Sequence, residues 1–337
     1  MINVAINGFG RIGRMVLRAG WDDKKINFVA INDLTDIQML AYLLKHDSTH
    51  GKFDKSISAN KKELIIGNKK VQILNEKDPN KLPWKKLKVD VVIESTGFFT
   101  TPDKARAHVK AGAKKVLISA PCKCDQVCPV DTKTLVYGVN HKDYNKKKHQ
   151  VLSNASCTTN CVAPILKIIN DQFGIKECFF STIHAYTATQ KLVDGPDKSL
   201  RKSRAAAINI IPSTTGADIA TVKAIPELEN KVKGIAYRVP VVDGSATDFN
   251  IITEKDITIE KVNSLFKKMA QSKFKGIVEY SEEELVSTDI IGNTHSSIFD
   301  SKMTYVLGKR NLKIISWYDN EWGYSCRMID MIKFITK

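Results

Sequence analysis

The stretch Ile2-Asn3-Val4-Ala5-Ile6-Asn7-Gly8-Phe9-Gly10-Arg11-Ile12-Gly13-Arg14 decides the fold of this chain. Its first residues have the short apolar pattern of a buried strand, and the apolar spacing that follows is helical. Between them lies a G-x-G-x-x-G motif, and this strand–turn–helix context distinguishes it from a chance match. Gly8 permits the tight turn, Gly10 lets the backbone approach a pyrophosphate, and Gly13 allows close packing of helix on strand. The stretch predicts a doubly wound parallel sheet that binds a dinucleotide.

An acidic residue at the expected place indicates which dinucleotide is bound. A second strand, Phe28–Ile31, is followed by Asp33, which lies 20 residues after Gly13. A carboxylate there accepts hydrogen bonds from the adenosine ribose and repels a 2′-phosphate, so NAD is favoured over NADP. A glycine-rich turn with a capping aspartate is the less favoured alternative.

Two further strands are expected in the same sheet. They are Val89–Glu94 and Lys115–Ser119, and each ends in small or polar residues. Ligands of open α/β sheets lie at the carboxyl ends of the strands. Thr96, Gly97 and Ser119 are therefore candidate residues of the cofactor groove.

A candidate nucleophile opens the second half of the chain. Cys157, in Ser156-Cys157-Thr158-Thr159-Asn160-Cys161, comes just before the helical pattern of residues 158–173. The positive field of a helix N-terminus lowers a thiol pKa, and a nearby histidine would lower it further and move the proton. His184 follows 27 residues later. Spacing does not establish spatial contact, and a buried structural cysteine and histidine are the alternative.

Length and composition favour a two-domain cytoplasmic protein. The chain has 337 residues, 43% of them hydrophobic, and no apolar run long enough to cross a membrane. Its start lacks the charged region of a signal peptide. Seven scattered cysteines do not resemble a disulfide framework, so a reduced compartment is expected.

The net charge of +16 lies mostly in the first half. Residues 1–156 hold 28 Lys and Arg against 15 Asp and Glu. Such a field attracts anionic ligands, and weak RNA binding is one hypothesis. The favoured alternative is that the short lysine clusters are solvated surface.

A cysteine-rich segment contains Cys122, Cys124 and Cys128. These residues could ligate a soft metal or sense oxidants, but structural zinc needs a fourth ligand that the sequence does not offer nearby. Loop cysteines without a function are favoured, and we expect no metal.

The remaining signals indicate two domains. Strand patterns at 249–252 and 313–316 flank a helical pattern at 259–270, which favours an α+β half with a largely antiparallel sheet. We expect an NAD-binding domain at 1–156 and a catalytic domain at 157–319. A helix at about 320–337 should pack back on the first domain.

Five motifs together resemble one family, the phosphorylating glyceraldehyde-3-phosphate dehydrogenases of NAD type. The motifs are Gly8–Arg14, Asn32-Asp33-Leu34, Ser153–Cys161, His184-Ala185-Tyr186-Thr187 and Trp317-Tyr318-Asp319-Asn320-Glu321. The resemblance runs from the first residues to the last helix, and the Ser-Asn-Ala-Ser-Cys-Thr-Thr-Asn-Cys string is highly specific.

This resemblance implies roles for individual residues. Cys157 is implied as the nucleophile and His184 as its base. Contacts with NAD are implied for Arg11, Ile12, Asp33, Lys77, Ser119 and Asn320, the last holding the nicotinamide amide. Binding of the two phosphate groups is implied for Ser156, Thr158, Thr187, Arg201, Thr215, Gly216 and Arg238. Lys77 stands where many members carry arginine, whereas Leu34 and Pro196 match the NAD type.

The implied reaction is the oxidation of glyceraldehyde 3-phosphate with NAD and inorganic phosphate to 1,3-bisphosphoglycerate, by a homotetramer, through a thioester on Cys157. Three alternatives stay open at this point. An erythrose-4-phosphate dehydrogenase shares nearly all of the motifs but hydrolyses its thioester. A Cys157–His184 hydrolase would leave the glycine motif and Asp33 without a use. An RNA-binding role has only the charge in its favour, without a dedicated motif.

Overall fold

The computed structural model describes residues 1–124 and 128–337. These residues form two compact units. The first contains residues 1–135, 141–155 and 325–337, and the second contains residues 136–140 and 156–324.

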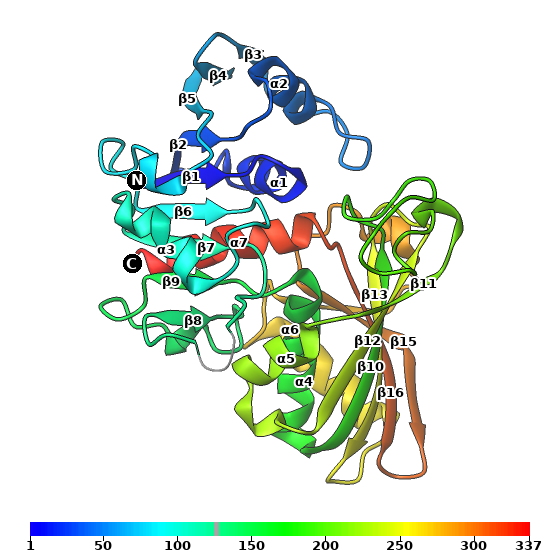
Figure 1. The fold of residues 1–337 in the computed structure, drawn as a ribbon. Coiled ribbons are helices and arrows are strands. Elements are labelled where there is room, and N and C mark those ends of the chain that lie inside the picture. The colour runs from blue at the N-terminus through cyan, green and yellow to red at the C-terminus, as the bar shows by residue number, and fades with distance from the viewer. Residues whose placement is uncertain (125–127) are drawn as a thin grey trace. The chain divides into compact units, whose positions relative to one another are not determined.

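The first unit is built on a nine-stranded sheet (Figure 1). Its strands lie in the order β3-β4-β5-β2-β1-β6-β7-β9-β8. Their bounds are β1 Ile2–Asn7, β2 Ile26–Asn32, β3 Ile57–Ala59, β4 Glu63–Ile66, β5 Lys69–Leu74, β6 Val91–Glu94, β7 Lys115–Ile118, β8 Thr132–Thr134 and β9 Val151–Ser153. Across the sheet, every neighbouring pair in the run β5-β2-β1-β6-β7-β9-β8 is parallel. The β3–β4 and β4–β5 pairs at the other edge are antiparallel. The segment β5-β2-β1-β6-β7-β9 has the strand order of dinucleotide-binding folds, which confirms the predicted Rossmann sheet.

Buried apolar side chains stabilise this sheet. Val4, Ile6, Val92 and Leu117, from its central strands, are fully buried, as expected for parallel strands covered on both faces. Three helices accompany the strands: α1 Arg11–Gly20, α2 Ile37–Lys45 and α3 Pro102–Lys110.

The last helix, α7 (Trp322–Ile335), has most of its length in the first unit. The Tyr144 hydroxyl donates to the carbonyl of Ile335 at 2.9 Å, and Lys333 forms an ion pair with Asp23 at 3.1 Å. These contacts connect α7 to residues far away in the sequence.

The second unit contains a seven-stranded sheet in the order β11-β12-β10-β13-β16-β15-β14. The bounds are β10 Ile175–Ala185, β11 Ile211–Thr214, β12 Val232–Val239, β13 Ser245–Thr253, β14 Val278–Ser281, β15 Ser297–Leu307 and β16 Asn311–Tyr318. Four of its six strand pairs are antiparallel, as the sequence predicts, whereas β10–β12 and β14–β15 are parallel.

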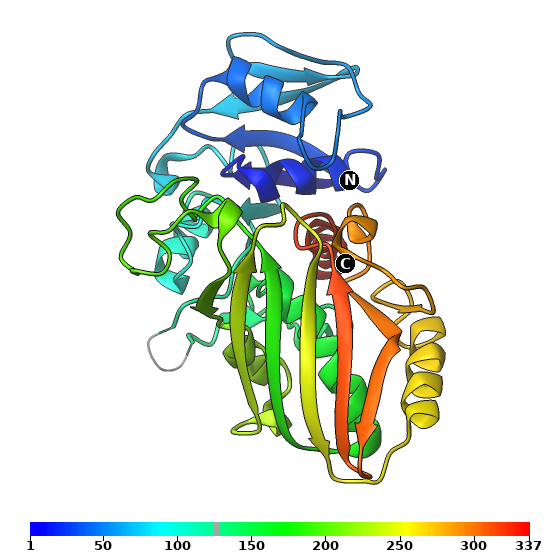
Figure 2. The same cartoon turned by 90° about the vertical axis from the view of Figure 1, so that its right-hand side faces the viewer.

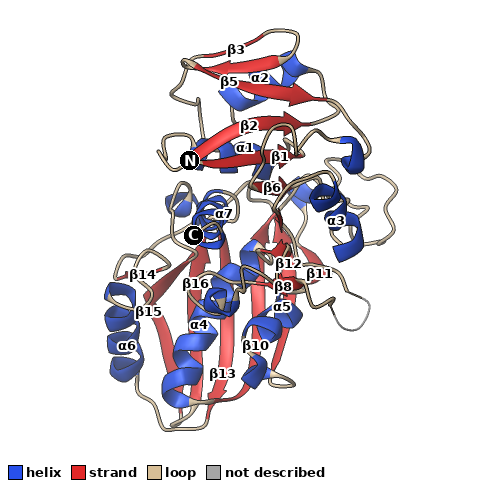
Figure 3. Ribbon diagram, turned by 90° about the vertical axis from the view of Figure 1, so that its left-hand side faces the viewer, coloured by secondary structure: helices blue, strands red, loops and turns tan. Residues whose placement is uncertain are grey.

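One face of this sheet is covered by helices. Figure 3 shows α4 (Cys157–Phe173), α5 (Ala217–Ala224) and α6 (Ile259–Gln271) in front of the strands, and Figure 2 shows the opposite face with its strands uncovered. Along β10, Phe180, Thr182 and His184 are buried whereas Phe179 and Ile183 are exposed. This two-residue alternation places His184 on the side of α4.

The cysteine-rich segment differs from its expectation. Cys124 and Cys128 are joined by a disulfide, with Cα atoms 5.2 Å apart, although the cysteine pattern predicted none. Spacing could not predict this pairing, because it depends on the path of the intervening chain. Cys122 is buried and is not part of this disulfide, and residues 125–127 lie outside the described part. Among the described residues, no helix combines the length and apolar character that a bilayer span requires.

Candidate active site

The glycine turn has the geometry that a pyrophosphate requires. Gly8 has φ +91°, and a Cβ on it would lie 2.6 Å from the Thr96 nitrogen. A Cβ on Gly13 would lie 2.3 Å from the Gly8 carbonyl oxygen, so only glycine fits at either position. Gly10 has no atom within 4 Å of its Cβ position, and it gives α1 no side-chain cap. The start of α1 is therefore open to an anion, which fits the phosphates of NAD.

Asp33 is held in place at the end of β2. Its Oδ2 accepts from the Phe9 N–H at 2.7 Å, and its Oδ1 accepts from the Thr35 N–H at 2.9 Å. The first bond connects the carboxylate with the glycine turn, so the two parts of the dinucleotide motif are brought together.

The other residues predicted to contact the cofactor have varied surroundings. Arg11 forms an ion pair with Asp47 at 2.6 Å. Burial opposes ionisation of Asp47, but the His50 N–H and Arg11 outweigh it and lower its pKa to about 2. Ile12 is partly buried in α1, and Lys77 is exposed after β5. Gly97 has φ +77° and is exposed, with space around its Cβ position.

A buried polar network supports the loop that holds Thr96. Glu94, at the end of β6, accepts from the Thr96 N–H at 2.9 Å and from the Asn7 amide at 2.6 Å. The His108 ring nitrogen Nε2 lies 2.9 Å from the same carboxylate. Since the indole N–H of Trp84 can only donate, its 3.0 Å contact makes Nδ1 of His108 an acceptor and leaves Nε2 to donate to Glu94. The Ser119 N–H donates to the Glu94 carbonyl at 2.9 Å.

Cys157 is the first residue of α4, as the helical pattern predicts. Ser156 is the N-cap, and its hydroxyl accepts from the Thr159 N–H at 3.1 Å. Ala155, just before it, has φ +55°, a left-handed conformation that costs energy for a residue with a side chain. Strain of this kind concentrates at functional sites.

The structure brings His184 to Cys157, which spacing alone left open. The His184 Nε2 lies 3.4 Å from the Cys157 Sγ. Arg238 lies beside the histidine because its position on β12 pairs in register with His184 on β10. Its Nη1 is 2.6 Å from the His184 Nδ1 and 2.9 Å from the Ala185 carbonyl.

The two pKa values correct one expectation. Burial, opposed by the Arg238 charge and the Thr158 N–H, raises the pKa of the Cys157 thiol, whereas the sequence predicted a lowered one. Burial and then the Arg238 charge lower the pKa of His184 to about 3. Sequence gives the helix position but not the burial, and burial dominates here. Both shifts favour the uncharged thiol and the uncharged imidazole.

The surroundings of His184 permit two tautomers. When Nδ1 donates to the Ala185 carbonyl, 2.7 Å away, an unprotonated Nε2 faces the thiol and can act as a base. When Arg238 donates to Nδ1, the proton is on Nε2 instead, because a guanidinium cannot accept. The position of Arg238 therefore influences which tautomer of His184 is present.

The predicted phosphate-binding residues fall into three local settings. The Thr158 hydroxyl lies 2.9 Å from that of Tyr318 and is buried. Thr215 and Gly216 precede α5, and the Thr215 hydroxyl accepts from the Ala217 N–H at 3.2 Å. Thr187 and Arg201 lie in the irregular segment between β10 and β11, and Arg201 is exposed.

Asn320 lies in a cluster that sequence reasoning did not find. Its Oδ1 accepts from the Ser245 hydroxyl at 2.6 Å, and its backbone N–H donates to Asp243 at 3.2 Å. Burial, and then the neighbouring Asp319 charge, raise the pKa of Asp243 to about 9. The only sequence signal for this cluster is that Asp319 adjoins Asn320 in the Trp317–Glu321 motif.

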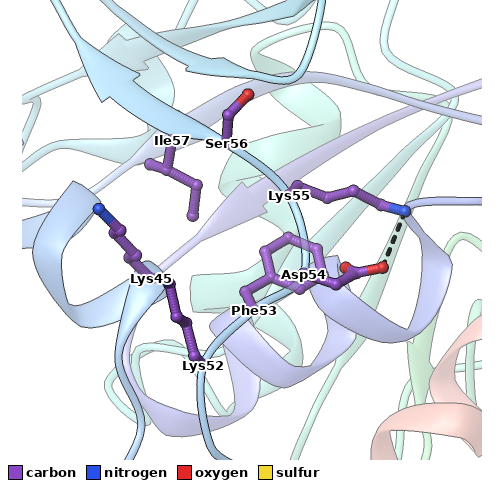
Figure 4. Close-up of a pocket in the computed structure, with 7 residues that line it drawn as sticks. All are labelled: Lys45, Lys52, Phe53, Asp54, Lys55, Ser56 and Ile57. Carbon is purple, nitrogen blue, oxygen red and sulfur yellow. Dashed lines mark hydrogen bonds and ion pairs between the residues drawn. The ribbon is translucent and has the colours of Figure 1, made fainter.

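A surface pocket of about 470 Å³ lies outside this chemistry. It is lined by Lys45, Lys52, Phe53, Asp54, Lys55, Ser56 and Ile57 (Figure 4). Lys55 forms ion pairs with Asp22 and Asp54. None of the predicted site residues lines this pocket.

Comparison with known proteins agrees with the geometry. A profile described as "Glyceraldehyde 3-phosphate dehydrogenase, NAD binding domain" matches residues 2–102, and one for the C-terminal domain of the same enzyme matches residues 156–320. The chain is 48% identical to the glyceraldehyde-3-phosphate dehydrogenase of Geobacillus stearothermophilus over 99% of its length and 98% of that protein's. It is 47% identical to glyceraldehyde-3-phosphate dehydrogenase 1 of Saccharomyces cerevisiae over the whole length of both.

Proposed function

Because this chain belongs to the glyceraldehyde-3-phosphate dehydrogenase family, an NAD-dependent oxidoreductase family, we propose that it converts glyceraldehyde 3-phosphate to 1,3-bisphosphoglycerate through a thioester on Cys157. The observation that carries the proposal is the 3.4 Å contact between Cys157 Sγ and His184 Nε2 at the start of α4. The nucleophile and its base are thereby within reach of one substrate carbon.

The first half of the reaction forms the thioester. Cys157 loses its proton to His184 as its sulfur attacks the aldehyde carbon, which gives a hemithioacetal. His184 returns that proton to the former carbonyl oxygen, which gives the hemithioacetal hydroxyl, and takes it back as the carbon loses its hydride, for which bound NAD would supply the acceptor. A phosphate group that draws Arg238 away from Nδ1 leaves that nitrogen to donate to the Ala185 carbonyl, so that Nε2 is the base.

The second half transfers the acyl group to inorganic phosphate. A phosphate oxygen attacks the thioester carbonyl, the C–S bond breaks, and the Cys157 thiolate leaves. Two anions must be bound, which fits the threonine hydroxyls, helix starts and arginines of the second unit.

Phosphate dependence tests the reaction. Purified protein is given glyceraldehyde 3-phosphate with NAD or NADP, with and without inorganic phosphate, and NADH formation is followed at 340 nm. Sustained turnover is expected only with both NAD and phosphate. Turnover with erythrose 4-phosphate that does not need phosphate would favour the alternative dehydrogenase and contradict the proposal.

A homotetramer is the proposed assembly. The uncovered face of the second sheet carries Phe179 on β10, Ile235 on β12, and Tyr305 and Leu307 on β15, all well exposed. Strand pairing through β13 and β16 places them on one side of the sheet. An apolar face of this kind is typical of a surface that a second copy covers.

Two lesser proposals follow from charge and from the reaction. The positive first half should bind RNA weakly, with an affinity that falls steeply as salt rises. A salt titration with a labelled RNA, with and without saturating NAD, tests this proposal, and RNA binding that is insensitive to salt would refute it.

We also propose that the protein is located in the cytoplasm, because the proposed reaction belongs to glycolysis.

A further inference from the structure

Ser245 lies between the end of the histidine strand and Asn320. Its hydroxyl oxygen accepts from the Ala185 N–H at 3.0 Å and donates to the Asn320 Oδ1 at 2.6 Å. Ser245 and Asn320 are both buried, with exposed fractions of 1% and 5%. Ser245 is the first residue of β13, so a strand and not a flexible loop fixes its position.

The chemistry of these contacts fixes the orientation of the Asn320 amide. The Ala185 N–H can only donate, so Ser245 must accept there and keeps its single hydrogen for Asn320. A separation of 2.6 Å is typical of O–H···O and too short for a usual N–H···O bond. The amide oxygen therefore faces Ser245, and the NH2 group faces away from it.

That NH2 group has no hydrogen-bond partner among the residues that the structure describes. The residue is 95% buried, but this nitrogen is not among the fully buried side-chain atoms that lack a partner, so it stays open to a ligand. The backbone N–H of Asn320 donates to Asp243, which holds the residue in this position. An amide nitrogen presented in this way can donate to a carbonyl oxygen.

We propose that Ser245 is a positioning residue that fixes Asn320 as a donor to the carbonyl oxygen of the nicotinamide carboxamide. This inference rests on the proposed role of Asn320 as the residue that holds that amide. It specifies which group of the carboxamide Asn320 binds: Asn320 donates to the carbonyl oxygen of the nicotinamide carboxamide and makes no bond to the NH2 of that carboxamide. Ser245 acts on the cofactor only through Asn320.

Binding measurements test the role without relying on turnover. Calorimetry gives the Kd of NAD and of ADP-ribose, which lacks the nicotinamide, for wild type and Ser245→Ala. The variant should bind NAD about 3–15-fold more weakly, the usual worth of one hydrogen bond, with unchanged ADP-ribose affinity. Ser301→Ala, which removes another buried hydroxyl of the second unit, one that donates to the Ser281 carbonyl, should alter neither. Equal losses for both ligands in Ser245→Ala, or no loss, would overturn the proposal.

A double-mutant cycle shows whether Ser245 acts through Asn320. In an Asn320→Ala background, adding Ser245→Ala should leave the NAD Kd unchanged. A further loss of the same size as in wild type would contradict the inference. Ser245→Cys, with a weak S–H donor in a similar volume, serves if the alanine variant does not fold, and should give a smaller loss in the same direction.

A cofactor analogue tests which group is recognised. The 3-acetylpyridine analogue of NAD keeps the carbonyl and lacks the amide NH2, so wild type should bind it within about threefold of NAD, a smaller change than a lost hydrogen bond. Binding as weak as that of ADP-ribose would show that the amide nitrogen is recognised and refute the orientation. If NAD itself bound no more tightly than ADP-ribose, both the inference about Ser245 and the proposed contact of Asn320 with the nicotinamide amide would be refuted. Absence of turnover with these binding results intact would remove only the proposed reaction.

Discussion

At the scale of single residues, Cys157 and His184 depend on burial for their protonation states. Burial raises the pKa of the thiol and lowers that of the imidazole, so both shifts favour the uncharged forms. The 3.4 Å contact provides the path by which the thiol proton passes to His184 when the sulfur attacks.

Replacing His184 by Asn should slow thioester formation by about 10²–10⁴-fold, because the base is lost. The substitution should also make the free energy of unfolding less dependent on pH in the acid range. The folded-state pKa of about 3 lies below the unfolded value of about 6.5, so wild type loses stability as pH falls between these values. At pH 5 this loss reaches about 2 kcal/mol, and His184→Asn lacks it. Urea unfolding of both proteins at pH 7.5 and pH 5 measures the difference, and parallel losses would show that His184 is not held neutral.

Asp33→Gly should weaken NAD binding and relatively improve NADP binding. The carboxylate bonds the ribose and repels a 2′-phosphate, and its loss also removes the bond to the Phe9 N–H. The ratio of kcat/KM for the two cofactors reports the change. An unaltered ratio would mean that another residue sets cofactor choice.

At the scale of elements, the glycine turn and α1 provide a matched pair of substitutions. A methyl on Gly13 would meet the Gly8 carbonyl, whereas a methyl on Gly10 meets no atom of the protein. Gly13→Ala should cost about 1–3 kcal/mol of stability, as overpacking does. Gly10→Ala should leave stability nearly unchanged but weaken NAD, because its methyl group occupies the approach of the pyrophosphate.

Thermal unfolding with and without NAD separates these effects. Gly13→Ala should lower Tm in both conditions. Gly10→Ala should keep the Tm of the free protein and lose most of the rise that NAD produces. A Gly10 variant with a normal NAD-induced rise would show that the pyrophosphate does not approach this glycine.

Local elements were predictable from sequence, and the contacts between them were not. The pattern of residues 158–173 predicted a helix that the structure places at Cys157–Phe173. In contrast, the contact of His184 with Cys157 depends on β10 reaching the start of α4, which a spacing of 27 residues does not specify. The bond from Ser245 to Asn320 joins the start of β13 to the turn after β16, and the pairing of Ser245 with Tyr318 in these two strands brings them together. The direction of the Cys157 pKa shift was wrong for a related reason, since burial is a property of the folded chain.

At the scale of the whole molecule, the uncovered face of the second sheet should hold copies of the chain together. Phe179→Glu places a charge on that face and should shift the protein toward smaller species in sedimentation velocity. Met39→Glu, at an exposed apolar residue on α2, is the control and should keep the wild-type mass. A Phe179 variant of unchanged mass would exclude this face from the assembly.

The most direct test of the central claim is to trap the acyl group on Cys157. The protein is mixed with glyceraldehyde 3-phosphate and NAD without phosphate, quenched in acid, digested and examined by mass spectrometry. The account predicts a phosphoglyceroyl adduct on the peptide that contains Cys157, removed within one turnover when inorganic phosphate is added before the quench. An unmodified Cys157, an adduct on another residue, or one that persists in phosphate would contradict it.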